Sequence, residues 1–116
     1  MGIRLAKPWT ALGAAAVRAL LGQLGVFELG DGEGTVLHIG YAGGRSLFGL
    51  RSAVEAAGQQ HRGARQFRYE VTMQYLTRYQ ELLMLHVADH GALPDGNRAE
   101  RLTLGRLSPL QAKARG

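Results

Sequence analysis

The apolar residues of this chain follow two different spacings. Three short stretches either are rich in β-branched and aromatic residues or alternate apolar with polar residues, which is typical of half-buried β-strands. These stretches span residues 25–29, 35–41 and 67–71. Two longer stretches repeat apolar residues every three or four positions, which predicts helices over about residues 46–57 and 73–90. The pattern therefore mixes strands and helices within one short chain.

Turn residues separate these stretches and complete the predicted order of elements. Asp31-Gly32-Glu33-Gly34 joins the first two strands, so the two strands are predicted to form a hairpin. Pro8 blocks a helix before it and Thr10 can cap one, which predicts a further helix over residues 11–23. The predicted fold class is α/β, a small sandwich in which helices flank a three-stranded, mainly antiparallel sheet.

Length and composition predict one domain without disulfides. At 116 residues the chain is long enough for a single core, and it has no cysteine. No apolar run approaches the ~20 residues that a membrane helix needs. Residues 11–21 resemble a weak signal peptide, but Arg18 interrupts the apolar run, so we expect a helix of the mature fold. The expected location is the cytoplasm, without contact with a membrane.

The sequence divides into three segments that differ in charge. An N-terminal helical segment (1–24) is expected to pack on a core (25–97), which a basic tail (98–116) with a short helix at Ser108-Pro109 follows. Residues 97–116 carry a net charge of +4 of the total +5, from Arg98, Arg101, Arg106, Lys113 and Arg115 against one glutamate. Such a tail is compatible with contacts to phosphates, or with arginines that are only solvated.

Short motifs occur in a fixed order along the predicted hairpin and helices. They are Gly25-Val26-Phe27, His38-Ile39-Gly40, Leu47-Phe48-Gly49-Leu50-Arg51, Glu81-Leu82-Leu83-Met84-Leu85 and Pro94-Asp95-Gly96-Asn97. In order and context they resemble the GIY-YIG nuclease family. In that family a "GIY" strand hairpins into a "YIG" strand, an arginine follows on a helix, and a glutamate precedes Pro-x-x-Asn. Phe27 and His38 stand where the family has its two tyrosines.

The resemblance implies a nuclease that hydrolyses phosphodiester bonds with Mg²⁺ or Mn²⁺. Glu81 would hold the metal ion, which polarises the phosphate. Arg51 would stabilise the transition state through paired hydrogen bonds. His38 would take the proton from water in place of a tyrosine, because its unperturbed pKa of about 6.5 suits that role. Substrate binding is assigned to Phe27, Arg45 and Asn97. The expected partner is nucleic acid, and DNA is favoured over RNA.

Each of these residues also has a structural interpretation. Arg51 can lie along its helix and pair with Glu55, and Glu81 can pair with Arg78 three residues earlier. Because Phe27 cannot transfer protons, the alternative function is a catalytically inactive GIY-YIG-like domain that binds nucleic acid or a protein. A protein with a purely structural role is the third hypothesis. The small surface would also suit a protein partner or a dimer.

One geometric test separates these hypotheses. If the chain is a nuclease, the side chains of His38, Arg51 and Glu81 should converge on one surface of the hairpin. Tyr41 alternates onto the strand face opposite His38, so it is not assigned to the site. The remaining aromatic and imidazole groups are predicted to be core residues or helix-end residues; they are Tyr69, Tyr75, Tyr79, His86 and His90.

Overall fold

The computed structural model describes residues 3–44 and 46–98. In these ranges the chain forms an α/β fold with a four-stranded antiparallel sheet of order β1-β4-β2-β3 and three helices. The strands are β1 (Thr10–Ala11), β2 (Gly25–Gly30), β3 (Val36–Ala42) and β4 (Gln66–Val71). The helices are α1 (Ala14–Arg18), α2 (Leu50–Gln60) and α3 (Tyr75–His90), followed by a short 3-10 helix, η1 (Asp95–Asn97).

The sheet has one strand more than the sequence predicts. Thr10 and Ala11 pair antiparallel with Phe67 and Gln66, and thereby extend the sheet beyond β4. The interpretation of Thr10 as a helix cap is therefore wrong. The first helix begins only at Ala14, after Gly13, and ends at Arg18. A two-residue strand has too few residues to show an alternating pattern, so only its pairing with β4 reveals it.

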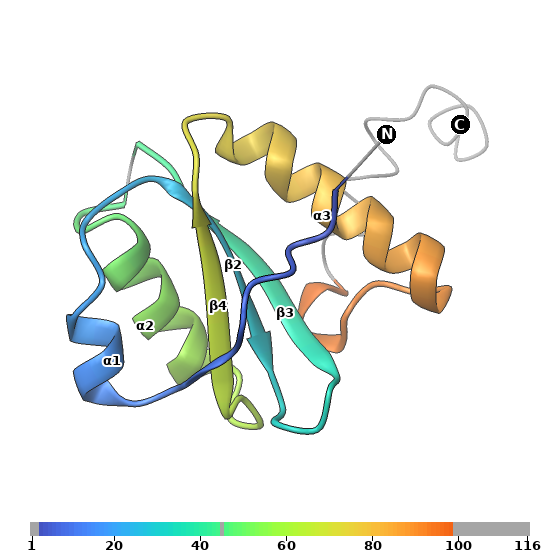
Figure 1. Cartoon of the computed structure of the whole chain (residues 1–116), viewed down its shortest axis with the longest axis horizontal. Helices are drawn as coiled ribbons and strands as arrows, with labels where there is room; N and C mark the ends of the chain where they lie inside the picture. Colours follow the sequence, from blue (N-terminus) through green and yellow to red (C-terminus); the bar gives the residue numbers. More distant parts are fainter. Residues whose placement is uncertain (1–2, 45, 99–116) are drawn as a thin grey trace.

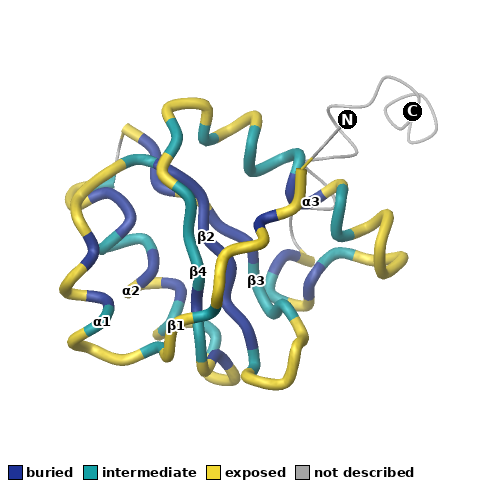
Figure 2. Tube along the Cα trace, in the orientation of Figure 1, coloured by how far each residue is buried: buried dark blue, intermediate teal, exposed yellow. Residues whose placement is uncertain are grey.

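The predicted hairpin is confirmed, and its first strand is the centre of the sheet. β2 pairs with β3 on one side and with β4 on the other, so that Phe27 lies opposite both Gly40 and Tyr69. All six residues of β2 are buried, which the dark central strand of Figure 2 shows. The sequence stretch that first suggested a family therefore forms the middle of the fold.

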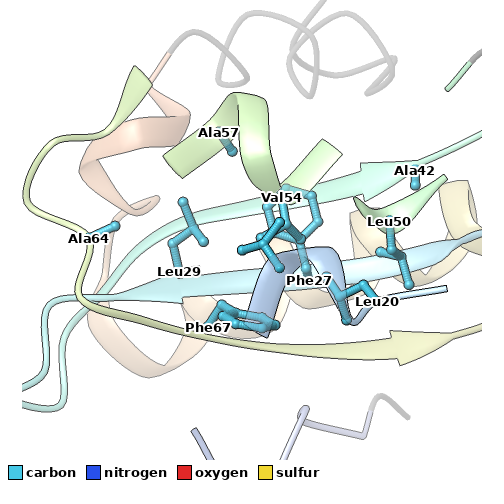
Figure 3. Close-up of a cluster of buried hydrophobic side chains, with 10 residues drawn as sticks. Leu20, Phe27, Leu29, Ala42, Leu50, Val54, Ala57, Ala64 and Phe67 are labelled. Atoms are coloured by element: carbon cyan, nitrogen blue, oxygen red, sulfur yellow. The ribbon is translucent and has the colours of Figure 1, made fainter. Parts of the chain in front are cut away.

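Helices cover both faces of the sheet. α1 and α2 lie on one face and α3 lies on the other (Figure 1). The larger cluster of buried apolar side chains lies on the α1/α2 face and is shown in Figure 3. Its members include Leu20, Phe27, Leu29, Leu50, Val54 and Phe67. The α3 face has a smaller cluster made of Leu5, Val26, Ile39, Leu82 and Leu83. The alternation of side chains along β2 sends Phe27 to the first face and Val26 to the second.

The two longer helices differ slightly from their predicted bounds. α2 begins at Leu50 instead of residue 46, because Gly49 has a φ of +55° and the Leu50 N–H donates to the Gln23 carbonyl. α3 ends at Gly91, which has a φ of +79°, as its sequence indicates. No helix in the described ranges is long and apolar enough to cross a membrane. The helix predicted at Ser108-Pro109 lies outside the described residues.

Candidate functional site

Three chain segments meet at one end of the sheet, which we call the loop end. They are residues 19–24 before β2, the described residues 43–44 and 46–49 after β3, and residues 72–74 after β4. Gly25 pairs with both Ala42 and Val71, so the start of β2 lies beside the ends of its two antiparallel neighbours. The Thr72 N–H donates to the Leu24 carbonyl at 3.0 Å, which joins two of these segments.

A pocket of about 490 Å³ opens at the loop end. It is lined by Tyr41, Gly43, Gly44, Ser46, Tyr75 and Leu76. The rings of Tyr41 and Tyr75 are nearly parallel, at 13°, with their centroids 5.9 Å apart. A side chain at position 43 would lie 2.7 Å from the Tyr75 ring, so a glycine is needed there for the ring to pack against the backbone. The Gly44 N–H donates to the Tyr75 hydroxyl oxygen at 3.4 Å.

Exposed apolar side chains occur in the segments of the loop end and directly beside them. Leu47 is 83% exposed and Met73 is 79% exposed, and Leu21, Phe48, Val71 and Leu76 are exposed as well. Large apolar side chains gathered on one end of a small domain are typical of a surface that binds a partner. The loop end is therefore the first candidate for a binding site.

The loop end also has a favourable charge for an anionic partner. None of its three segments contains Asp or Glu. The guanidinium of Arg51, at the start of α2, lies over the Phe48 ring at 6.0 Å, and its Nε donates to the Leu20 carbonyl at 3.2 Å. Arg51 makes no ion pair with any described residue, so its charge is available to a ligand. The predicted pairing with Glu55 does not occur.

Along the outer edge of β3, on the hairpin side of the strand, a buried amide ties η1 to β3; we call this region the clamp end. The Asn97 side chain is fully buried; its Oδ1 accepts from the Ile39 N–H at 2.7 Å, and its Nδ2 donates to the Ile39 carbonyl at 2.8 Å. β3 is the edge strand on this side of the sheet. The amide therefore satisfies two backbone groups of an edge strand as a neighbouring strand would.

His38 belongs to the clamp end. Its ring stacks on the His61 ring with centroids 4.4 Å apart, and its Nδ1–H donates to the Gly96 carbonyl at 3.3 Å. Burial, and then the neighbouring His61, lower the pKa of His38 from 6.5 to about 4, while the Gly96 carbonyl opposes the change. The imidazole is therefore neutral at pH 7, and with this pKa it is a weak base.

The predicted convergence of three catalytic side chains is not found. His38 lies on the α1/α2 face, where its ring contacts Phe27. Glu81 lies on the α3 face, because its carboxylate accepts from Arg78, which also binds Glu70 of β4. Arg51 lies in the first turn of α2, and His61, whose ring stacks on that of His38, follows the last residue of α2. The helix between positions 51 and 61 is about 15 Å long, so it separates Arg51 from the two histidines. Sequence order alone could not show this separation.

Phe27 and Asn97, two of the residues assigned to substrate binding, are buried. Phe27 is 2% exposed and Asn97 is 0% exposed, so neither can contact a substrate in this structure. Phe27 packs in the larger core cluster, and a side chain at position 40 would lie 2.4 Å from its ring. This contact explains why Gly40 of the second motif has no side chain. Arg45 lies outside the described residues.

Most acidic and imidazole groups in the described ranges make structural contacts. No group of three or more His, Cys, Asp or Glu residues that could hold a metal ion occurs among the described residues. Glu28 is buried and binds Arg68 at 2.8 Å; burial raises its pKa, and the Arg68 hydrogen bond opposes the increase. The Nδ1–H of His86 donates to the Ala92 carbonyl at 2.8 Å. These groups are therefore engaged in structural contacts.

Sequence reasoning missed the two tyrosines of the pocket. The sequence pattern predicts Tyr75 as a core residue, and it gives Tyr41 no role in the site because Tyr41 faces away from His38. That alternation is correct, and it places Tyr41 against Tyr75 and Tyr79 of α3. The available signal was Gly43-Gly44, which directly follows β3 and lies two residues after Tyr41; such glycines indicate a close approach of the backbone to another group.

Comparison with known protein families gives a match over most of the chain. The family described as a domain of unknown function, DUF7508, matches residues 3–89 of the chain. No curated protein and no solved structure matches it significantly.

Proposed function

The chain belongs to the DUF7508 family, and we propose that it is a nucleic-acid-binding domain with a GIY-YIG-like fold and no catalytic activity. The observation that carries this proposal is the aromatic pocket at the loop end. Nucleic acids offer flat bases that stack on aromatic rings and phosphates that pair with arginine. The pocket has Tyr41 and Tyr75 in its lining, and the loop end has the unpaired Arg51 and no carboxylate in its three segments.

The order of elements supports the family resemblance. The two hairpin strands are followed by a helix that begins with Leu50-Arg51, then by a strand, a helix with Glu81 and a turn with Asn97. The resemblance implies this order for the hairpin, the arginine, the glutamate and the asparagine, although Glu81 lies inside α3 and not at its start. The proposal of a GIY-YIG-like fold rests on this order and on the motifs, and the position of His38 away from Glu81 favours a domain without catalysis.

A Mg²⁺- or Mn²⁺-dependent nuclease is the second candidate, and one contact favours it. Arg78 binds both Glu70 and Glu81, so two carboxylates face one cation. Carboxylates in such a position are suitable ligands for a divalent ion if the arginine moves away. Glu81 would hold the ion, which would polarise a phosphate. In the described structure, however, Arg78 neutralises both groups.

Binding is tested with fluorescently labelled DNA and RNA oligonucleotides and the full chain. Leu76 and Met84 are both exposed residues of α3, but only Leu76 lines the pocket. We expect Leu76→Asp to weaken binding by about tenfold through charge repulsion, while Met84→Asp changes it less than twofold. If no oligonucleotide binds, or if both variants behave alike, the proposal is wrong.

Cleavage is tested on the same oligonucleotides with Mg²⁺, with Mn²⁺ and with a chelator. The binding-domain proposal predicts no cleavage under any of these conditions. Cleavage that Glu81→Gln abolishes, and that Glu55→Gln on the exposed side of α2 leaves intact, would establish the nuclease instead.

The protein is expected to act in the cytoplasm, where DNA is the first partner to test and RNA the second. A protein partner or a second copy of the chain would extend its small surface.

A further inference from the structure

We propose that the pocket at the loop end takes an unpaired base, so that the protein prefers single-stranded nucleic acid to a duplex. This inference rests on the proposed function and specifies its ligand. It comes from the composition of the pocket, from the ion pairs of the arginines elsewhere on the domain, and from the exposed apolar rim.

The pocket offers a stacking surface with polar groups beside it. The Tyr75 ring is fixed against Gly43 and by the hydrogen bond from the Gly44 N–H. The Tyr41 ring, which is nearly parallel to it, extends this surface. The space where a side chain at position 44 would lie is open, with no atom within 4 Å. A base can therefore approach the tyrosines over Gly44, and Ser46 can hydrogen-bond to its edge.

The flat face of a base is accessible only when the base is unpaired. Within a duplex each base is covered above and below by its neighbours, so an aromatic pocket cannot stack on it without unstacking. In a single strand the same base can turn into a pocket at low cost. An aromatic pocket therefore discriminates between the two forms by itself.

A duplex requires a broad surface of free cations, and ion pairs with carboxylates reduce the number of free cations on the described part of the domain. Binding to duplex comes mainly from many phosphate contacts. Several arginines already pair with carboxylates in the structure; they are Arg4 with Asp89, Arg68 with Glu28, Arg78 with Glu70 and Glu81, and Arg98 with Asp95. At the loop end, Arg51 is available for a phosphate beside a stacked base.

The exposed apolar rim fits the same ligand. Phe48 lies under the Arg51 guanidinium and is 53% exposed, so it can extend the stacking surface toward the next base. The absence of acidic residues from the three segments favours an anionic chain over a basic peptide. These features together favour a nucleic acid strand as the ligand of the loop end.

The experiment compares the affinity of the full chain for a single-stranded 12-nucleotide DNA with that for the same sequence in a duplex. A second labelled strand carries 2-aminopurine, a base whose fluorescence falls when it stacks on an aromatic ring. We expect the single strand to bind at least about tenfold more tightly and its 2-aminopurine signal to fall on binding. The wild-type protein alone gives both readouts.

Variants of Tyr75 connect the preference to the pocket. Tyr75→Leu removes the ring and should weaken single-strand binding at least about fivefold, the lower range for loss of one stacked base, and abolish the 2-aminopurine change. Tyr75→Phe keeps the ring and should retain both the affinity, within about twofold, and the fluorescence change. Circular dichroism and thermal melting establish that each variant folds. If Tyr75→Leu does not fold, the wild-type fluorescence change decides.

Three results would overturn the inference, and they differ in whether the proposed nucleic-acid binding remains valid. Equal binding of single strand and duplex, with no change in 2-aminopurine fluorescence, would remove the base pocket but leave the proposed nucleic-acid binding intact. No binding of either form would remove both proposals. A strong preference for single strands that Tyr75→Leu leaves unchanged would show that the base binds elsewhere, and would overturn the inference as well.

Discussion

The clamp end and the loop end use their side chains in opposite ways. At the clamp end the polar groups of Asn97 and His38 turn inward and bind the backbone of neighbouring segments. At the loop end, where the pocket opens, the large apolar groups of Leu47 and Met73 turn outward. The polar groups of the clamp end are satisfied by hydrogen bonds within the domain, whereas the apolar groups of the loop end are exposed to solvent.

This difference indicates where stability and where binding are located. Buried polar groups are costly unless they are paired, so changes at the clamp end should mainly lower stability. Exposed apolar groups contribute little to the folded core, so changes at the loop end should mainly affect a ligand. The predictions below test this division, from the largest expected effect to the smallest.

Asn97→Ala should have the largest effect on stability. It leaves the buried N–H and C=O of Ile39 without their partner, at about 1–3 kcal/mol for each group. We expect the free energy of unfolding to fall by about 4 kcal/mol in urea denaturation. Asp95→Ala, in the same turn but exposed, is the control and should change stability by less than about 0.5 kcal/mol. A loss below about 1 kcal/mol for Asn97→Ala would contradict the clamp.

His38 should make stability depend on pH. Because burial lowers its folded pKa to about 4, the unfolded chain takes up a proton near pH 6.5 while the folded protein does not. Stability should therefore be full above pH 6.5 and decrease as the pH falls toward 4, by up to about 3 kcal/mol. The measurement is the difference in unfolding free energy between wild type and His38→Phe, from pH 7 to pH 4. A difference that stays constant with pH would show that His38 is protonated equally in both states.

Gly49→Ala tests whether the loop end depends on backbone conformation. Gly49 has a φ of +55°, and a side chain there would lie 2.5 Å from the Gln23 carbonyl oxygen. We expect a loss of about 2 kcal/mol in thermal or urea unfolding, because the left-handed conformation and the backbone contact both disfavour alanine. Gly44→Ala, whose side chain would meet open space, should leave stability nearly unchanged. Equal effects of the two changes would contradict the described loop.

Arg51→Gln should have the smallest effect, and only on binding. One lost phosphate contact should lower the slope of log affinity against log salt by about 0.7 for a single strand, with little change in melting temperature. Arg62→Gln removes an exposed arginine of the loop after α2, toward the clamp end, and is the matched control. If both variants lower the slope equally, the charge of the loop end has no special role.

Much of the fold could be predicted from local patterns. The alternating residues of Phe67-Arg68-Tyr69-Glu70-Val71 indicate a half-buried strand, and β4 spans Gln66–Val71. Asp31-Gly32-Glu33-Gly34 indicates the hairpin turn, and β2 and β3 pair across it. These elements are set by side-chain period and by turn chemistry, which depend only on neighbouring residues.

The candidate site could not be predicted in the same way. His38, Arg51 and Glu81 occur in a suitable order, but the structure separates them because the sheet lies between His38 and Glu81 and the length of α2 lies between His38 and Arg51. The pocket brings together Tyr41 and Tyr75, which are 34 positions apart and were assigned no shared role.

Local sequence patterns predicted the strands β2, β3 and β4, the hairpin and the two longer helices, because each depends on residues a few positions apart. The sequence by itself also determined that the chain has no disulfide and a nearly neutral body with a basic tail. Only the tertiary structure decided which side chains are accessible: it buried Phe27 and Asn97, neutralised Glu81 with Arg78, and opened a pocket beside Tyr75. The physical reason is that burial and convergence depend on which elements pack together, and that packing joins residues far apart in the chain.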